Sequence, residues 1–292
     1  MWITSDFCDY ELLDTSDGER LERWKDIILI RPDPQIIWKN SKKHPLWSKA
    51  NARYIRSSKG GGAWDVRNLK DNELNKGWVI DRHGLRFCVR PTGFKHTGVF
   101  PEQAVNWDFI TEKVKNAGRE ISVLNLFAYT GGATLAAAKA GAKVCHVDAS
   151  KGIVAWAKEN AALSGLENAP IRYIVDDCKK FIEREIRRGH KYDAIIMDPP
   201  SYGRGPGGEV WKLEDGIDEL VRLTSVLLSD NPLFVLINSY TAGLSASTIG
   251  YLLELYIKQN HGGKVSSDEI GLPVTATGAV LPSGSSARWE KF

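Results

Sequence analysis

The stretch VLNLFAYTGGATLAAAKAGAKVCHVDAS, residues 123–150, decides the fold. An apolar run leads into a pair of glycines, then an alanine-rich segment, then a second apolar run that ends on an acidic residue. This order predicts a strand, a tight turn, a helix and a second strand parallel to the first. Units of this kind bind nucleotide-like ligands at the turn, so the spacing of the glycines indicates which ligand fits.

From residue 121 onward, strand-like runs alternate with helical patterns, which predicts a doubly wound, mostly parallel α/β sheet. We expect strands at residues 121–127, 143–148, 171–176, 192–198 and 233–238. We expect helices at residues 101–116, 132–140, 151–164, 178–188, 214–228 and 251–260. The C-terminal tail has short β-like runs and predicts a closing antiparallel pair. Ligands of such a sheet bind at the carboxyl ends of its strands.

The N-terminal part of the chain has a different pattern. Residues 1–98 are rich in short β-branched and aromatic runs broken by Pro, Gly and Asp, which predicts a smaller β-rich domain. The larger α/β domain is expected at residues 99–292. Within the small domain, residues 57–66 (SSKGGGAWDV) predict a loop, and His83-Gly84 predicts a hairpin turn.

Charge is unevenly distributed along the chain, although the formal net charge is only +3. Residues 39–95 carry 14 Lys and Arg against 4 Asp and Glu, a net charge of +10. Basic residues interleaved with aromatic ones suit a polyanion with exposed bases, such as RNA. The alternative is a solvated basic face over a small β-core that buries the aromatic side chains. The aromatic residues in or beside this stretch are Trp38, Trp47, Tyr54, Trp64 and Trp78.

The bulk composition indicates a chain with a sizeable core, since 42% of its 292 residues are hydrophobic and 26% are charged. No apolar run approaches the roughly 20 residues of a membrane helix. The N-terminus lacks the basic-then-apolar order of a signal peptide. We therefore expect a cytoplasmic protein without a membrane partner. The four cysteines form no C-x-x-C pair, so neither a metal site nor a disulfide framework is expected.

The glycine spacing excludes the common phosphate-binding loops. Residues 129–134, YTGGAT, lack the G-x-G-x-x-G spacing of a dinucleotide site, and the chain contains no G-x-x-x-x-G-K-[S/T] string. What is left is a turn of small residues at a helix N-terminus, which favours a carboxylate. S-adenosylmethionine presents a carboxylate, a ribose diol and an adenine, and it carries no phosphate. It is therefore the cofactor that the pattern predicts.

Acidic residues follow the next three strands, and each matches a group of this cofactor. Asp148 can accept hydrogen bonds from the ribose hydroxyls. Asp177 can accept from the adenine amine, with Asp176 as the alternative, and the backbone N–H of Cys178 can meet a ring nitrogen. Asp198, followed by two prolines, puts a carboxylate and a rigid turn where the methyl group is delivered.

The segment from residue 94 to the C-terminus resembles the class I methyltransferase family of bacterial enzymes that modify large-subunit ribosomal RNA, which includes cytosine-C5 and guanine-N7 methyltransferases. The matching motifs are GFKHTGVFPEQ (93–103), LNLFAYTGG (124–132), HVDAS (146–150), VDDC (175–178) and DPPSYG (198–203). The resemblance implies a Rossmann-like class I methyltransferase sheet and an S-adenosylmethionine site within these motifs. The predicted cofactor-binding residues are Gln103, Phe127, Tyr129, Thr130, Gly131, Asp148, Ala149, Ser150, Asp177, Cys178 and Asp198.

The absence of one residue type bears on the atom that is methylated. Methylation of carbon-5 of cytosine requires a cysteine thiolate that first attacks carbon-6 of the base. In the cytosine enzymes of this family that cysteine follows the fifth strand, where this chain has residues 238–241, NSYT, and the position after the two prolines holds Ser201. We therefore expect a nitrogen target and no covalent intermediate, with cytosine-C5 chemistry as the alternative.

Asp198, Pro199, Pro200 and Tyr202 are the predicted catalytic residues. We expect Asp198 to accept a hydrogen bond from the target amino group and Tyr202 to stack on the base. The alternative is that Tyr202 only supports the cofactor. Residues 201–215 are rich in glycine, which predicts either a loop that closes over the substrate or touches a phosphate, or a plain connection.

Three classes of function are compatible with these patterns. The first is a methyltransferase for RNA, in particular ribosomal RNA; the second is a methyltransferase for a protein or a small molecule; the third is a binding protein without catalysis. The intact Asp198-Pro199-Pro200 argues against the third class, and the basic stretch favours the first over the second. A nicotinamide dehydrogenase is disfavoured by the glycine spacing. The sequence leaves the oligomeric state open.

Overall fold

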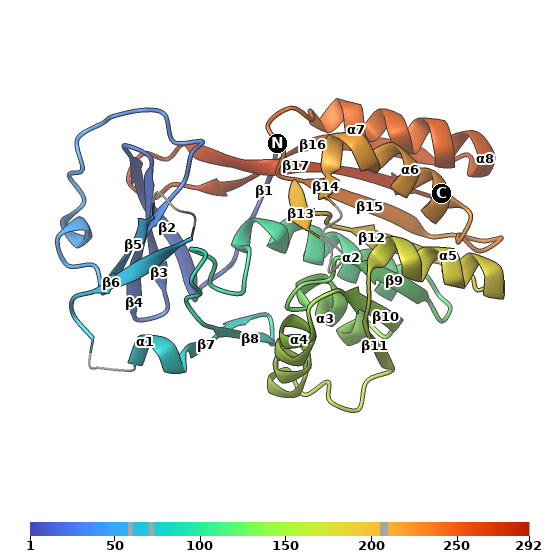
Figure 1. The fold of residues 1–292 in the computed structure, drawn as a ribbon, viewed down its shortest axis with the longest axis horizontal. Coiled ribbons are helices and arrows are strands. Elements are labelled where there is room, and N and C mark those ends of the chain that lie inside the picture. Colours follow the sequence, from blue (N-terminus) through green and yellow to red (C-terminus); the bar gives the residue numbers. More distant parts are fainter. Residues whose placement is uncertain (58–60, 70–72, 205–209, 292) are drawn as a thin grey trace. The chain divides into compact units, whose positions relative to one another are not determined.

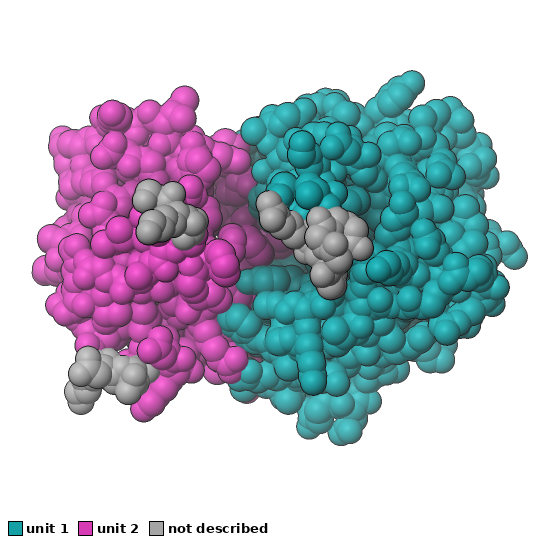
Figure 2. All heavy atoms as spheres, viewed as in Figure 1, with its two compact units in different colours: residues 1–2, 105–270, 284–292 teal, residues 3–104, 271–283 magenta. Residues whose placement is uncertain are grey.

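The computed structural model describes residues 1–57, 61–69, 73–204 and 210–291. The chain forms two compact units, which Figure 2 colours separately. The larger unit consists of residues 1–2, 105–270 and 284–292, and the smaller unit of residues 3–104 and 271–283. The smaller unit therefore includes a C-terminal segment, which the predicted boundary at residue 98 does not assign to it.

A mixed eight-stranded sheet forms the larger unit's framework (Figure 1). Its parallel strands are β9 (Ser122–Leu126), β10 (Lys143–Asp148), β11 (Ile171–Val175), β12 (Ala194–Met197) and β15 (Phe234–Ser239). The antiparallel β17 (Val280–Glu290) pairs with β15, and β16 (Lys264–Pro273) and β1 (Trp2–Ile3) complete the order β1-β16-β17-β15-β12-β9-β10-β11. The predicted doubly wound sheet with an antiparallel closing pair is confirmed. From β9 the strand order runs in both directions, through β10 and β11 on one side and through β12 and β15 on the other, so β9 is the point at which the order reverses.

Helices alternate with these strands. They are α2 (Ala104–Asn116), which follows the 3-10 turn η2 (Pro101–Gln103), α3 (Gly132–Lys139), α4 (Lys151–Leu163), α5 (Cys178–Arg188), α6 (Leu213–Ser225) and α7 (Ala246–Leu253). The helix α7 continues through the π-helical turn η3 (Glu254–Lys258) into α8 (Gln259–His261). The helix predicted to begin at residue 251 begins earlier, at Ala246. Ser245 caps α7 there by accepting a hydrogen bond from the Thr248 N–H at 3.2 Å.

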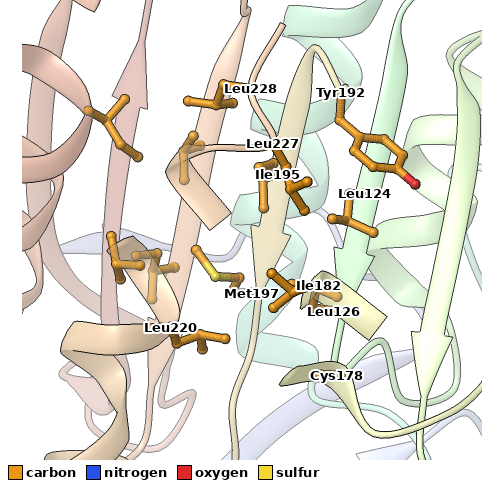
Figure 3. Close-up of a cluster of buried hydrophobic side chains, with 14 of the residues drawn as sticks. Leu124, Leu126, Cys178, Ile182, Tyr192, Ile195, Met197, Leu220, Leu227 and Leu228 are labelled. Atoms are coloured by element: carbon orange, nitrogen blue, oxygen red, sulfur yellow. The ribbon is translucent and has the colours of Figure 1, made fainter. Parts of the chain in front are cut away.

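The apolar residues of the strands meet α5, α6 and α7 on one face of the sheet. Figure 3 shows part of this cluster, in which Leu126, Met197 and Ile182 are fully buried. Burying one such side chain contributes roughly 1.5–3 kcal/mol relative to leaving it exposed. Successive strand residues point to opposite faces, so the residues that alternate with this cluster point toward the face of α2, α3 and α4. The ring of Phe109 on α2 packs against Phe234 on β15, 5.3 Å between centroids.

The smaller unit has its own antiparallel-rich sheet in the order β2-β3-β4-β5-β6. The strands are β2 (Tyr10–Ser16), β3 (Glu19–Trp24), β4 (Ile27–Pro32), β5 (Ala52–Arg56) and β6 (Gly62–Val66), joined in part by η1 (Pro45–Trp47). A hairpin of β7 (Trp78–Arg82) and β8 (Leu85–Val89) follows α1 (Glu73–Lys76). Its turn residues His83 and Gly84 have φ of 53° and 76°, which confirms the predicted hairpin.

The loop predicted at residues 57–66 is wrong for its second half. Residues 62–66 form β6, because Trp64 stacks edge-on against Tyr54 across the pair, with 5.4 Å between ring centroids. Gly62 makes this approach possible, since a Cβ there would lie 2.7 Å from the Tyr54 ring. Residues 58–60 lie outside the described part of the chain.

A buried charge cluster ties β2, β3 and β4 together. Glu22 is inaccessible to solvent and accepts from Arg31 Nε at 2.6 Å and Nη2 at 2.7 Å. It also accepts from the Tyr10 hydroxyl at 2.8 Å. Burial alone would raise the pKa of Glu22, but the guanidinium groups of Arg20 and Arg31 outweigh it and lower that pKa to about 2. The cluster therefore stays ionised and links side chains from the three strands.

Two of the five aromatic residues in or beside the basic stretch, Trp47 and Tyr54, are buried, whereas Trp64 and Trp78 are half-buried and Trp38 is exposed. Trp47 is buried and donates from Nε1 to Asp14 Oδ2 at 2.8 Å, and the Tyr54 hydroxyl donates to the Gly93 carbonyl at 2.7 Å. The alternative of a β-core that buries its aromatics therefore holds for Trp47 and Tyr54. The described part of the chain contains no helix with the length and apolarity needed to cross a bilayer.

Candidate active site

Backbone strain is concentrated in the turn between β9 and α3. Phe127, Tyr129 and Gly131 adopt left-handed conformations with φ of 54°, 51° and 92°. This costs roughly 1–2 kcal/mol for a residue other than glycine, and such strain persists where the surrounding structure enforces it. The N–H groups of Phe127, Ala128, Tyr129 and Gly131 all donate to acceptors within the protein. No side chain caps α3, which begins at Gly132. The first N–H groups of α3 are therefore the backbone donors available to an anionic group.

Asp148 holds this turn from the neighbouring strand. Its Oδ2 accepts from the Tyr129 N–H at 3.0 Å, and its Oδ1 accepts from the Ser150 N–H at 2.9 Å. Burial raises the pKa of Asp148 more than these two hydrogen bonds lower it. The carboxylate is half-buried and each oxygen retains further acceptor capacity. It can therefore shape the turn and still receive hydroxyl groups.

Beneath the turn, a chain of buried polar side chains fixes its base. Asn125 Nδ2 donates to Thr134 Oγ1 at 2.9 Å, and Thr134 Oγ1 lies 2.9 Å from Nδ1 of His146. Asn160 on α4 donates to the Thr130 carbonyl at 3.0 Å. Burial lowers the pKa of His146 to about 3, so the imidazole is neutral. Sequence reasoning missed these four side chains, because an isolated polar residue in an apolar run carries no periodic signal.

Close packing explains the second glycine of the turn. A Cβ on Gly132 would lie 2.6 Å from the ring of Trp107, a buried residue of α2. On Gly131, which is left-handed, a Cβ would lie 3.3 Å from Ala157 on α4. The glycine pair therefore allows α2 and α4 to approach the turn, in addition to giving the backbone its conformation.

The two adjacent aspartates after β11 have different surroundings. Asp176 forms an ion pair with Arg184, which lies farther along α5. Asp177 is exposed and caps α5, with Oδ1 accepting from the Lys180 N–H at 2.9 Å. The ion pair holds Asp176 against α5, whereas Asp177 lies at the strand-end edge. This arrangement favours Asp177 over Asp176 as the residue that meets an adenine.

Three of the four cysteines are buried. Cys178 is buried, and its Sγ accepts from the Phe127 N–H at 3.3 Å, which helps to hold the left-handed turn. Burial raises the pKa of Cys178 well above its usual value and that of Cys145 to about 11. Cys88 is buried in the smaller unit and Cys8 is exposed there. Neither Cys145 nor Cys178 is therefore a thiolate at neutral pH.

Asp198 follows β12 at the point where three strands end. Its N–H donates to the Leu126 carbonyl of β9 at 3.4 Å. The preceding residue, Met197, pairs with Leu126 on one side and with Ile237 of β15 on the other. Pro199 is buried and Pro200 is exposed, so the chain turns outward immediately after the carboxylate.

A short hairpin follows the prolines. Its strands are β13 (Tyr202–Arg204) and β14 (Val210–Lys212), and Tyr202 is opposite Lys212. Trp211 donates from Nε1 to the Pro200 carbonyl at 2.7 Å, and its ring lies 6.1 Å from that of Phe127. Tyr202 remains 52% exposed, so it has room for a stacking partner. Part of the glycine-rich loop predicted at residues 201–215, namely residues 205–209, lies outside the described residues.

The remaining predicted residues are placed as follows. Ala149 and Ser150 are exposed after β10, and Ser150 Oγ caps α4 by accepting from the Ile153 N–H at 3.4 Å. Thr130 is buried in the turn. Gln103 is buried in η2 and belongs to the smaller unit, so its part in the site stays a prediction. Among the described residues, no three His, Cys, Asp or Glu side chains gather as metal ligands.

These groups fit the predicted cofactor. The first N–H groups of α3, at the end of the strained turn, suit the methionine carboxylate, and the Asp148 carboxylate suits a diol. Asp177 and the first N–H groups of α5 suit the adenine edge, because the first N–H groups of a helix have no partner within it. All three lie at the carboxyl ends of β9, β10 and β11, the strands around the reversal in sheet order.

Comparison with known proteins agrees with this interpretation. The sequence model of one family, described as S-adenosylmethionine-dependent methyltransferase, matches residues 40–254. The chain belongs to this family. Its cofactor is therefore S-adenosylmethionine, as predicted, and the predicted fold and family resemblance are confirmed. The match begins within the basic stretch and ends at the close of α7.

Solved structures and curated relatives extend the comparison. The methyltransferase is similar to a SAM-dependent methyltransferase from Agrobacterium tumefaciens, at 39% identity and a TM-score of 0.92, covering 99% of this chain and 92% of that one. A SAM-dependent methyltransferase from Streptococcus mutans shares the fold, at 20% identity and a TM-score of 0.71, covering 98% and 76%. Ribosomal RNA large subunit methyltransferase K/L of Shewanella frigidimarina is 36% identical over 155 residues, which are 52% of this chain and 21% of that protein. The chain thus spans about a fifth of the length of the curated relatives it matches.

Proposed function

We propose that this methyltransferase transfers a methyl group to a nitrogen of a base in RNA, in particular ribosomal RNA. The observation that carries the proposal is the row of carboxylates at one edge of the sheet. Asp148 is the last residue of β10, Asp177 and Asp198 follow β11 and β12, and only Asp198 is succeeded by two prolines. The first two match the cofactor, which leaves Asp198 for the acceptor.

The chemistry divides between the cofactor and the chain. S-adenosylmethionine supplies a methyl group on a positively charged sulfur, and the carbon–sulfur bond breaks with its electrons going to that sulfur. Asp198 holds the acceptor amino group, so that its lone pair is aligned with the methyl carbon, and takes the surplus proton as the nitrogen–carbon bond forms. Tyr202 stacks on the base. The remaining predicted residues of the larger unit bind and orient the cofactor; they are Phe127, Tyr129, Thr130, Gly131, Ala149, Ser150 and Cys178.

A covalent cysteine mechanism is disfavoured. The segment after β15 has Ser239 and Tyr240 where a nucleophile is expected. Burial raises the pKa of Cys178, and that thiol accepts from a backbone N–H beneath the turn. A nitrogen acceptor needs no nucleophile from the protein, because its own lone pair attacks.

Exposed positive charge on the smaller unit favours RNA over a protein or a metabolite as the substrate. Lys39, Lys43 and Lys49 of the smaller unit are exposed, and none of them forms an ion pair among the described residues. Exposed cations of this kind neutralise phosphates. A curated relative's name refers to large-subunit ribosomal RNA, which supports the same substrate class. The cytoplasmic location expected from the sequence stays a prediction.

The proposal is tested with S-adenosylmethionine labelled on its methyl group. The full-length protein is incubated separately with total RNA, total protein and small metabolites from cells that lack the gene. We expect label in the RNA fraction, and we expect nucleoside digestion to place it on a base nitrogen. Label confined to protein or metabolites would instead support the second class of methyltransferase, and label on carbon-5 of cytosine would overturn the nitrogen assignment.

A further inference from the structure

Asn238 lies beside Asp198 at the carboxyl edge of the sheet. Met197 of β12 pairs in register with Ile237 of β15. The residues that follow them, Asp198 and Asn238, are therefore neighbours on two parallel chains whose backbones are about 4.8 Å apart. Met197 and Ile237 both belong to the core under α5, α6 and α7. Asp198 and Asn238 therefore point toward the opposite face. Asn238 is only 3% exposed, and a polar residue so deeply buried requires an explanation.

A chain of hydrogen bonds fixes the orientation of the Asn238 amide. Arg288 has only donors, and its Nε and Nη2 donate to Asn106 Oδ1 at 3.1 and 2.6 Å. Asn106 must therefore present Nδ2 on its other side, and this group donates to Asn238 Oδ1 at 2.9 Å. Ser286 Oγ donates to the same oxygen, also at 2.9 Å. The guanidinium of Arg288 is itself held over the ring of Trp2, 3.8 Å from its centroid.

These hydrogen bonds fix the direction of the Asn238 Nδ2 donor. Because Oδ1 of Asn238 is engaged by Asn106 and Ser286, its Nδ2 is turned away from both. Within the described part of the chain, no residue accepts a hydrogen bond from this Nδ2. Asn238 Nδ2 is not among the described chain's buried polar atoms without a partner, so this donor is open to water or to a ligand. The group is adjacent to the carboxylate that the proposed function assigns to the acceptor.

We propose that Asn238 is a specificity residue that reads the base held by Asp198. Asp198 accepts from an exocyclic amino group, and Asn238 Nδ2 donates to the ring nitrogen next to that amino group. This inference rests on the proposed function and narrows it. The substrate is then a base with an amino group beside an unprotonated ring nitrogen, as in adenine or cytosine or on the N2–N3 side of guanine. The methylated atom is the amino nitrogen, and uracil is rejected because it has no amino group.

The role of Asn238 is tested by replacing its hydrogen-bond donor with an acceptor. Asn238→Asp keeps the shape and the acceptor for Asn106, but it replaces the Nδ2 donor with an acceptor. With ribosomal RNA from cells lacking the gene, we expect kcat/KM for methyl transfer to fall about 10- to 100-fold, as when a hydrogen-bonding group loses its partner. The Kd for S-adenosylmethionine should change less than about twofold, because the cofactor groups are untouched. Thr224→Val, an isosteric change of a buried polar residue on the opposite face, is the matched control and should keep kcat/KM within about threefold.

A substrate-side measurement makes the test independent of folding of the variant. Once the methylated base is mapped, a short RNA is made in which the neighbouring ring nitrogen of that base is replaced by C–H. The wild-type protein should lose about as much kcat/KM on this RNA as Asn238→Asp loses on the natural one. Unchanged kcat/KM in both experiments, or methyl transfer to a ring carbon, would overturn the assignment of Asn238. Absence of transfer to any RNA by the wild-type protein would instead reject the proposed function itself.

Discussion

The Asp148 carboxylate accepts a hydrogen bond from the Tyr129 N–H at 3.0 Å, and this contact joins the end of β10 to the strained turn after β9. Tyr129 has a φ of 51°, which an L-residue rarely adopts without support. The same carboxylate is the proposed acceptor for the ribose hydroxyls. Support of the carboxylate-binding turn and recognition of the ribose are therefore combined in one side chain, so a change at Asp148 affects two parts of the cofactor site.

Replacing Asp148 with Asn should weaken cofactor binding. The new Nδ2 would face one of the N–H groups of Tyr129 and Ser150, and the charged acceptor for the ribose would be removed. We expect the Kd for S-adenosylmethionine to rise about 10- to 100-fold, since hydrogen bonds to charged groups contribute roughly 1.5–3 kcal/mol. Isothermal titration measures this. Asp176→Asn, which breaks only the ion pair with Arg184, is the control and should leave the Kd within about twofold.

The raised pKa of Asp148 adds a pH dependence to the same experiment. Burial raises this pKa above the ordinary aspartate value, so protonation begins at a higher pH than for an exposed aspartate. Cofactor affinity requires the carboxylate, and it should therefore fall as the pH is lowered toward that pKa. Asp148→Asn should lose this part of the pH dependence. An identical pH profile in the two proteins would contradict the role given to Asp148.

The glycine pair gives a contrast between two substitutions. Gly132→Ala puts a Cβ 2.6 Å from the buried Trp107 ring, so α3 or α2 must shift. Overpacking of this kind costs typically about 1–3 kcal/mol. Gly152→Ala in α4 meets nothing within 4 Å and has helical backbone, so it should be neutral or stabilise by up to roughly 1 kcal/mol. Thermal unfolding compares them, and equal melting temperatures would show that the Trp107 ring is not restrictive.

His146 should make the protein sensitive to acid. Its pKa is lowered to about 3 by burial, whereas an unfolded histidine titrates near 6.5. Between these values the unfolded state binds the extra proton, so stability is fully present above the unfolded pKa and falls as the pH is lowered. The slope is about 1.4 kcal/mol per pH unit for one proton. In urea unfolding at several pH values from 7 to 4, His146→Gln should show a shallower loss than the wild type. Parallel curves would exclude this contribution.

Much of the fold followed from periodicity alone. The strands β10 and β11 begin where the apolar runs predict, and α5 has the predicted ends because Asp177 caps it and Gly189 terminates it with a φ of 68°. Motif reasoning also placed the turn, Asp148 and Asp198 on strand ends. These features are local, since each depends on residues within one strand–turn–helix unit.

The features that sequence reasoning missed depend on contacts between distant segments. Thr134 and His146 meet only after α3 folds over the sheet, and Asn238 meets Asn106 across 132 residues. The strand at residues 62–66 was hidden by a run of glycines that looks like a loop, although Gly62 is required by packing against Tyr54. Composition could not reveal that Trp47 is part of a core. Long-range packing overrides local propensity in each case.

Binding of RNA by the smaller unit should depend steeply on salt. Replacing Lys39, Lys43 and Lys49 with Gln removes three exposed cations, so the slope of log K against log salt should fall by about 0.7–0.9 for each phosphate that is no longer neutralised. Filter binding of ribosomal RNA fragments between low and moderate salt measures the slope. The matched control replaces Lys115, Lys143 and Lys264 of the larger unit with Gln. An equal reduction in both triple variants would indicate non-specific attraction instead of a basic recognition face.

The groups that bind the cofactor and the group that holds the acceptor should be separable at this sheet edge. The most direct measurement is methyl transfer to RNA by Asp198→Ala, with S-adenosylmethionine binding titrated in the same preparation. We predict that transfer falls by about 10³-fold or more, a loss in the range of a removed electrostatic or acid–base group. The cofactor Kd should stay within about tenfold of the wild type, because Asp148 and the turn remain. Transfer at the wild-type rate with normal cofactor binding would contradict the role of Asp198.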